Sequence, residues 1–148
     1  MRIVCLLLAI LSYGCAAEGW ISVSDKRVLH LRTDVGNYAL FDIRCSNTYD
    51  ILLGASFLTA ELADQEIINK LVIDDVPYPN YLAPETPPPN LAAFNAFWDA
   101  LRNAKRLVVV VDGKPRKVST VNLVDVLPAA EEPGFNCRPV TPEGTLIQ

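Results

Sequence analysis

The stretch that decides the fold is LAAFNAFWDALRNA at residues 91–104, which KRLVVVV follows at residues 105–111. Its large apolar residues recur at steps of three and four positions: Leu91, Phe94, Phe97, Trp98 and Leu101. This spacing places them on one side of a helix. Asn90 stands at the N-cap position, and Lys105 and Arg106 follow the helix where cations favour its dipole. We therefore predict an amphipathic helix packed on a sheet, followed by a valine-rich strand buried on both faces.

The residues after the valine run predict a hairpin. Asp112–Gly113 is a turn pair, and residues 118–124 alternate as the returning strand. The cations Lys114, Arg116 and Lys117 would then lie at the hairpin tip. In an acidic protein they could steer an anionic partner, or they could simply form a solvated turn. A short helix is expected to begin within residues 125–132.

Upstream of the helix, four segments read as strands: residues 26–33, 38–45, 49–57 and 67–73. The second segment alternates most clearly, with Asp42 and Arg44 opposite Phe41, Ile43 and Cys45. We expect the second and third segments to pair as a hairpin.

Six prolines mark residues 77–89 as an extended surface loop, because proline cannot donate to a strand ladder. The loop is either a plain connector or, by composition, a polyproline recognition segment. Tyr78 and Tyr81 are its aromatic residues and its candidate partner-binding residues.

Together these segments predict an α+β, mostly β fold: an antiparallel sandwich or half-open barrel of about six strands with one packed helix. A length of 148 residues fits one domain. We place a single globular domain at residues 18–137, between a leader at 1–17 and a flexible C-terminal tail at 138–148.

Residues 1–17 have the order of a secretory signal peptide. Arg2 gives a positive start, residues 3–11 form an apolar run, and small residues lead to a cleavage site after Ala17. The run is shorter than the ~20 apolar residues of a transmembrane helix. A bacterial lipoprotein signal, cut before Cys15, is one alternative, and a buried N-terminal strand or helix is another. We expect a periplasmic or secreted protein, or one lipid-anchored through Cys15.

Four cysteines are present, and two of them, Cys5 and Cys15, lie in the leader. An oxidising compartment favours a disulfide between the remaining two, Cys45 and Cys137. This bond would close a loop of about 90 residues, to which chain entropy assigns roughly 4–5 kcal/mol. A nucleophilic or redox cysteine is the alternative, but the chain contains no Cys-x-x-Cys pair.

Residues that carry chemistry are few. The net charge of −4 disfavours a nucleic-acid surface of the usual basic kind. The chain has no phosphate-binding glycine loop, zinc-ligand spacing or nucleophile elbow, so we expect neither cofactor nor metal. His30 is a structural or surface imidazole or, alternatively, a general base. Asp74 and Asp75 would point to opposite faces of a strand, which makes them a poor acid–base pair. We therefore interpret them as strand-end and turn residues.

Two separated stretches share one order of elements. Residues 39–45, ALFDIRC, read as a strand that ends in a cysteine. Residues 97–111, FWDALRNAKRLVVVV, lead through VSTVNL at 118–123 to Cys137. This order resembles small secreted bacterial proteins of the type VI secretion-associated periplasmic family and, more loosely, of the invasion-associated locus B family. It covers about half of the chain and leaves the proline-rich loop without a counterpart. The resemblance implies a structural Cys45–Cys137 bridge and no catalytic residue.

We therefore expect a non-catalytic binding or accessory protein of the bacterial envelope, associated with secretion or host-interaction machinery. The first alternative is an inhibitor of a secreted hydrolase, a lysozyme or peptidase, whose cleft the proline-rich loop would plug. The second is a hydrolytic enzyme that uses Asp74 or His30. The expected partner is an envelope protein or a secreted hydrolase and not a nucleic acid. The sequence leaves the partner's identity and the oligomeric state open.

Overall fold

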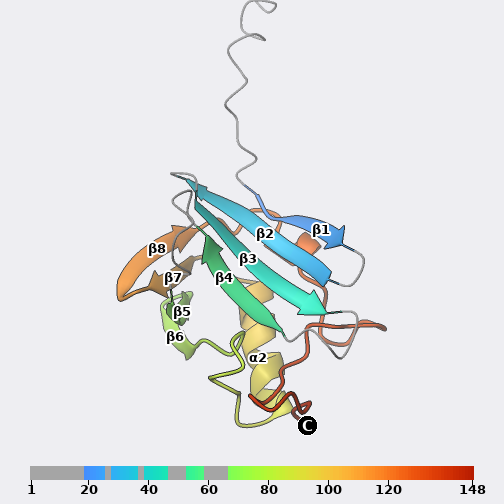
Figure 1. Ribbon diagram of the computed structural model, residues 1–148. Helices are drawn as coiled ribbons and strands as arrows, with labels where there is room; N and C mark the ends of the chain where they lie inside the picture. Colours follow the sequence, from blue (N-terminus) through green and yellow to red (C-terminus); the bar gives the residue numbers. More distant parts are fainter. Residues whose placement is uncertain (1–18, 26–27, 37–38, 47–52, 59–66) are drawn as a thin grey trace, which may run out of the picture.

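The computed structural model describes residues 19–25, 28–36, 39–46, 53–58 and 67–148 (Figure 1). The expected signal peptide and the start of the strand expected at 49–57 lie outside these ranges. The described residues form two four-stranded antiparallel sheets and two helices, α2 (Leu91–Arg102) and α3 (Leu123–Val126). The predicted α+β, mostly β sandwich is confirmed, with β1 to β8 in place of about six strands.

Sheet A contains, in spatial order, β1 (Ile21–Asp25), β2 (Val28–Gly36), β3 (Ala39–Ser46) and β4 (Gly54–Leu58). Its inner face supplies buried core side chains from three strands: Leu31, Phe41, Ile43, Cys45 and Phe57. The predicted alternation of β3 is confirmed, because successive side chains of a strand point to opposite sides. The sequence prediction missed β1: residues 21–24 alternate as Ile-Ser-Val-Ser, although all four are exposed.

Sheet B has the order β6-β5-β7-β8 and contains β5 (Ile68–Ile73), β6 (Val76–Pro79), β7 (Leu107–Val111) and β8 (Lys114–Val118). Two-residue turns at Asp74–Asp75 and Asp112–Gly113 close its two hairpins. All four turn residues have positive φ, as hairpin turns of type I′ require. Helix α2 lies between the hairpins in the chain, so the sheet depends on the later pairing of β5 with β7.

Strand β6 corrects the interpretation of residues 77–89 as wholly loop. Pro77 and Pro79 pair with Val72 and Lys70 in an edge strand of sheet B. In an antiparallel hairpin, the residue pairs alternate between hydrogen-bonded and non-hydrogen-bonded ones. Counted from the two-residue turn, Pro77 and Pro79 both belong to non-hydrogen-bonded pairs. The proline nitrogens therefore face the open edge, where the ladder requires no donor.

The basic segment after β7 is also corrected. Residues 114–117 do not form a hairpin tip: they make up most of edge strand β8, and Asp112–Gly113 is the tip. A two-residue turn pairs Val111 directly with Lys114, so the returning strand begins at the first cation.

The strand predicted at residues 118–124 is wrong, because the β7–β8 pairing ends at Val118. Residues 123–126 instead form helix α3, two residues before the start of the predicted helix. Leu123 and Leu127 are buried in the core. The apparent alternation therefore reflects one turn of helix that contributes to the core, not a strand.

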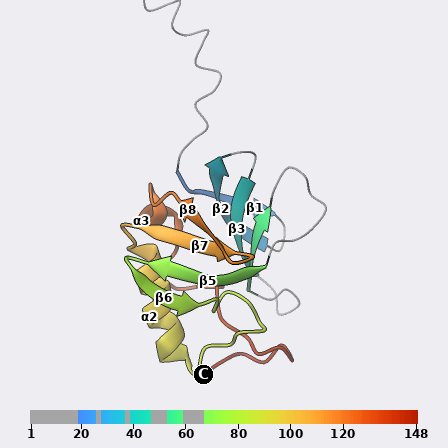
Figure 2. The same ribbon diagram turned by 90° about the vertical axis from the view of Figure 1, so that its left-hand side faces the viewer.

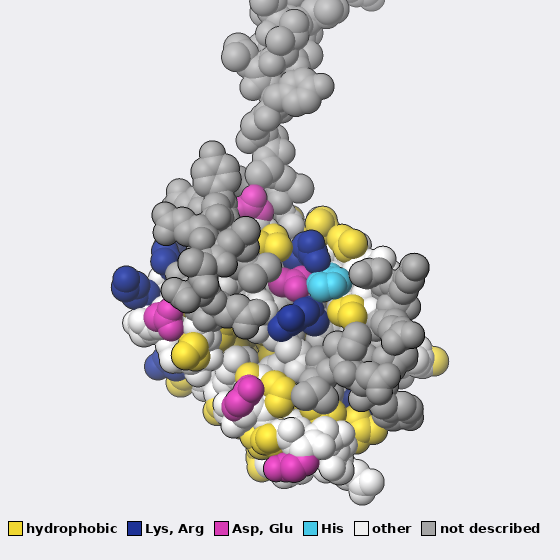
Figure 3. Space-filling view, viewed as in Figure 1, with side chains coloured by type: hydrophobic (Ala, Val, Ile, Leu, Met, Phe, Trp, Pro, Cys, Tyr) yellow, Lys and Arg dark blue, Asp and Glu magenta, His cyan; other side chains and the backbone are white. Residues whose placement is uncertain are grey.

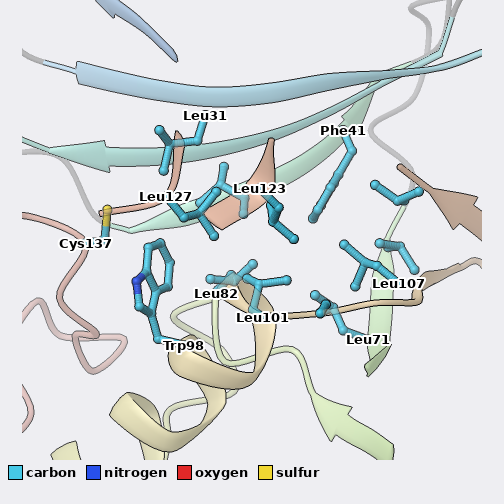
Figure 4. Packing of buried hydrophobic residues seen from close by; sticks show 14 of the residues in the cluster. Leu31, Phe41, Leu71, Leu82, Trp98, Leu101, Leu107, Leu123, Leu127 and Cys137 are labelled. Carbon is cyan, nitrogen blue, oxygen red and sulfur yellow. The ribbon is translucent and has the colours of Figure 1, made fainter. Parts of the chain in front are cut away.

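Helix α2 confirms the main prediction. The side-chain oxygen of Asn90 accepts a hydrogen bond from the N–H of Ala93 at 2.8 Å. The buried face of the helix consists of Phe94, Phe97, Trp98 and Leu101. Trp98 and Leu101 point towards Leu31 of sheet A, with side chains of sheet B to one side (Figure 4). One core therefore joins both sheets and the helix.

The predicted disulfide is confirmed. Cys45 and Cys137 are bonded across a sequence separation of 92 residues, and both are fully buried. The bond connects the inner face of β3 to the segment that follows α3. It therefore closes β4 to β8, α2 and α3 into one covalent loop.

Residues 138–148, which we expect to be a flexible tail, fold back against the domain. Val140 and Leu146 form a β-bridge, and the backbone N–H of Leu91 donates to the carbonyl of Gln148 at 3.2 Å. A hydrogen bond from Thr141, and to a lesser degree one from its own backbone, lowers the pKa of Glu143. The end of the chain thus meets the beginning of α2.

Candidate functional site

Strand β8 presents three exposed cations, Lys114, Arg116 and Lys117, which are the basic residues predicted to bind a partner. Because β8 is an edge strand, the backbone N–H and C=O groups along its outer side could pair with a strand of another molecule. Pro115 removes one outward N–H, and the charged side chains add a second obstacle to pairing. A partner would therefore meet the side chains of β8 rather than its backbone.

The outer face of sheet B is mostly apolar. The strand register places eight side chains on it: Val72, Val108, Val110, Pro77, Pro79, Pro115, Lys70 and Lys117. The expected burial of β7 on both faces is wrong, because Val108 and Val110 remain partly exposed while the alternate residues are buried. Figure 2 shows β5, β6 and β7 facing the viewer with no described helix or strand over them. None of the eight side chains that the register of the described strands places on this face is acidic.

Tyr78 and Tyr81 take a different position from the one the plug interpretation needs. Their ring centroids lie 5.6 and 5.5 Å from that of Phe97 on α2, and both rings are half-buried. Tyr78 belongs to β6, at the edge of sheet B opposite β8. The structure therefore does not bring the predicted tyrosines together with the predicted cations.

Asp74 and Asp75 occupy the β5–β6 turn, as predicted. One carboxylate oxygen of Asp74 accepts the backbone N–H groups of Lys105 and Arg106, at 3.0 and 2.8 Å. Asp75 forms an exposed ion pair with the side chain of Arg106. Asp74 thus connects the hairpin to the start of β7, and its contacts are those of a structural residue.

His30 has a partner that sequence reasoning missed. On the outer face of sheet A, its Nδ1 lies 3.0 and 3.2 Å from the two carboxylate oxygens of Asp42. Nε of Arg32 lies 3.3 Å from the same carboxylate. Asp42 is only 4% exposed although it faces away from the core. Figure 3 shows the imidazole and a carboxylate together, with Lys or Arg side chains on both sides.

Arg44 completes this cluster. It pairs directly with His30 across the β2–β3 ladder, and Arg32 pairs with Asp42, so all four side chains share one face. The Arg44 guanidinium lies over Gly54 of β4, with Nη2 3.1 Å from where a Cβ would stand. We call His30, Arg32, Asp42 and Arg44 the sheet A quartet. His30 and Arg32 are two residues apart in one predicted strand, and Asp42 and Arg44 are two apart in the next, so each pair shares a face. Only the register between the two strands shows that both pairs share the same face.

The quartet can orient an imidazole and present cations. With Nδ1 directed to Asp42, Nε2 is the ring nitrogen left for another contact. Within the described ranges, no group of three or more His, Cys, Asp or Glu residues is placed to hold a metal ion. No helix formed by the described residues is long and apolar enough to cross a membrane.

Comparison with known proteins yields no relative. No family model matches the chain, and no curated protein or solved structure matches it either. Function must therefore be argued from the two surfaces described above.

Proposed function

We propose that the chain is a non-catalytic, exported binding protein of the bacterial envelope, whose partner is an acidic protein surface. One observation supports this most directly: the partly exposed valine and proline face of sheet B is bordered by lysines and the basic strand β8. Exposed apolar patches with polar borders are typical of protein interfaces.

Charge defines the partner. The outer face of sheet B carries Lys70 and Lys117, whereas Lys114 and Arg116 of edge strand β8 alternate to the other side of the sheet, within a protein of net charge −4. Such a local excess of positive charge attracts an acidic surface and speeds its encounter. It also disfavours face-to-face pairing of two copies, because lysines would meet lysines. A nucleic acid is disfavoured because the apolar residues here are valine and proline rather than stacking aromatics.

Export is proposed from the leader at residues 1–17 and fits the buried Cys45–Cys137 bond, since disulfides persist in oxidising compartments. Mass spectrometry of the N-terminus of the protein recovered from a bacterial envelope fraction tests this step. A mature chain that begins at Glu18 supports a periplasmic or secreted protein. One that begins with a lipidated Cys15 supports the membrane-anchored alternative, and retention of Met1 contradicts export.

The binding proposal is tested by capturing envelope proteins on the oxidised protein and comparing matched variants. Lys70→Gln/Lys117→Gln removes the two charges of the face, whereas the control Lys105→Gln/Arg138→Gln removes a Lys and an Arg elsewhere. We expect an acidic protein in stoichiometric amount that only the first variant loses and that raised salt weakens.

A third variant, Val108→Thr/Val110→Thr, changes the apolar strip at nearly constant shape. We expect the same loss of capture. Equal capture by all variants, or equal loss in the control, contradicts the proposal. Tyr78→Phe/Tyr81→Phe keeps the ring packing on Phe97 and tests the inhibitor alternative, which predicts loss of a captured hydrolase.

Hydrolysis is the second candidate function, and the His30–Asp42 contact is the observation that favours it. A carboxylate at Nδ1 orients an imidazole so that Nε2 can take a proton. Asp74, by contrast, is occupied by two backbone N–H groups. Hydrolysis of ester or peptide substrates that is abolished in His30→Gln would support this candidate, and identical rates in the variant would eliminate it.

A further inference from the structure

The sheet A quartet lies on a different sheet from the proposed protein interface, and it has an excess of positive charge. Two guanidinium groups, Arg32 and Arg44, share this face with the single carboxylate of Asp42. Asp42 is already shared, since His30 Nδ1 contacts both of its oxygens and Arg32 Nε approaches one of them. The two guanidinium groups and the one carboxylate therefore carry a net charge of about +1.

The cations are not fully satisfied within the protein. The Nε atom of Arg32 is buried and has no hydrogen bond that meets ordinary geometry. Arg44 forms no ion pair with any carboxylate in the described part of the chain. Its guanidinium lies over the bare backbone of Gly54. Guanidinium donors whose acceptors are incomplete can form strong, charge-assisted hydrogen bonds to an anion.

Asp42 contributes to this arrangement from beneath. Its carboxylate is 4% exposed, so it does not itself present negative charge to a ligand as a free surface acid would. Its contacts fix the imidazole of His30 and the side chain of Arg32. Preorganised donors bind an anion with less loss of side-chain entropy.

An apolar surface adjoins the quartet. On the neighbouring strand β1, Ile21 pairs with Arg32 and Val23 pairs with His30, so both point to the same outer face. Their exposures of 47% and 42% are high for aliphatic side chains. Directly opposite side chains on a sheet lie within contact distance. A ligand that reaches the cations can therefore place an apolar group on Ile21 and Val23.

We propose that the sheet A quartet binds an oxyanion group, a carboxylate or a phosphate, that carries an apolar chain. Arg32 and Arg44 hold the oxyanion, because guanidinium groups match the oxygens of carboxylates and phosphates. Ile21 and Val23 contact the apolar chain. This site does not depend on the protein interface proposed for sheet B, and it requires no catalysis.

The test is a titration of the oxidised full chain, followed by amide NMR and calorimetry at constant ionic strength. The probes are octanoate and octyl phosphate, with acetate and inorganic phosphate as counterparts that lack the apolar chain. We expect saturable shifts at Gly54, Arg44 and Val23 for at least one long-chain probe. That probe also identifies whether the preferred oxyanion is a carboxylate or a phosphate. Binding of the short counterparts should be at least about tenfold weaker, since burial of a few methylenes exceeds 1.4 kcal/mol.

Matched variants decide whether the quartet is responsible. Arg44→Gln should weaken binding at least about tenfold, through loss of a charge-assisted hydrogen bond. The control Arg116→Gln removes the same charge on β8 and should leave the affinity unchanged. Val23→Ser should weaken only the long-chain probes.

Several results would overturn the proposal: no saturable shift with any probe, equal effects of Arg44→Gln and Arg116→Gln, or equal affinity for long and short probes. Arg32→Gln gives a second measurement if Arg44→Gln loses the native spectrum.

Discussion

Loss of the Cys45–Cys137 bond should remove a large share of the stability of the domain. The bond spans a sequence separation of 92 residues. The chain-entropy relation converts a loop of this length into about 4.6 kcal/mol at 25 °C. Small domains have a total stability of ~5–15 kcal/mol, so the reduced protein should lie close to its unfolding threshold. The chain without the bond gains freedom mainly in its unfolded state.

The assay is urea unfolding followed by tryptophan fluorescence, because Trp20 and Trp98 are both buried in the core. The oxidised protein is compared with the same protein refolded in reductant, so that the two samples differ only in the disulfide bond. We expect a loss of roughly 4–5 kcal/mol and a steeper dependence on urea, since the uncrosslinked chain exposes more surface.

The double variant Cys45→Ala/Cys137→Ala is the control, because reductant should not affect it. Its stability should resemble that of the reduced protein, apart from the smaller cost of two truncated buried side chains. A difference below about 1 kcal/mol between oxidised and reduced protein, with an unchanged slope, would refute the entropic reasoning.

Four further substitutions test the structure through unfolding free energies. Asp74→Ala should cost about 1–3 kcal/mol because two backbone N–H groups lose their acceptor, whereas Asp75→Ala should cost less than about 1 kcal/mol because its ion pair is exposed; equal costs would contradict the assignment. Asn90→Ala should cost about 1 kcal/mol through loss of the α2 cap, and an unchanged midpoint would show that the cap is unimportant. In Trp98→Phe the carbonyl of Pro128 loses the indole N–H that donates to it at 2.8 Å, so the free energy of unfolding should fall by about 1–3 kcal/mol. A variant as stable as the parent would show that this hydrogen bond does not contribute to stability.

Several predictions that depend on local patterns are confirmed. The apolar spacing of residues 91–101 predicts α2, since a helix places residues three and four apart on one side. Alternation predicts which side of β3 faces the core, and the positive φ of Asp112–Gly113 follows from its residue types. Each of these features is decided within a few neighbouring residues.

The errors arose where a neighbour distant in the sequence decides the outcome. Residues 77 and 79 read as loop, yet they form an edge strand because β5 supplies the pairing and the open edge tolerates proline. Val108 and Val110 read as fully buried, yet no described element covers the outer face of sheet B. Composition indicates what a residue can do, but the order of strands in the sheet decides where it lies.

The candidate sites show the same division. The exposed cations of β8 follow from the sequence, because three charges in four residues are seldom buried. Their position beside an apolar sheet face, and at the opposite edge from Tyr78, depends on the order β6-β5-β7-β8. The quartet depends even more on the fold, since His30 reads as a lone imidazole until the β2–β3 register places it diagonally beside Asp42.

The sequence by itself determined the mostly β class, the central helix and the pairing of Cys45 with Cys137, because periodicity, capping and the count of cysteines outside the predicted leader are properties of the chain. Only the tertiary structure decided which side chains of different strands meet. Strand register is fixed by turns and by packing of the whole sheet, and a shift of one residue would move every side chain to the other face. The surfaces on which function is proposed therefore exist only once both sheets have assembled on α2.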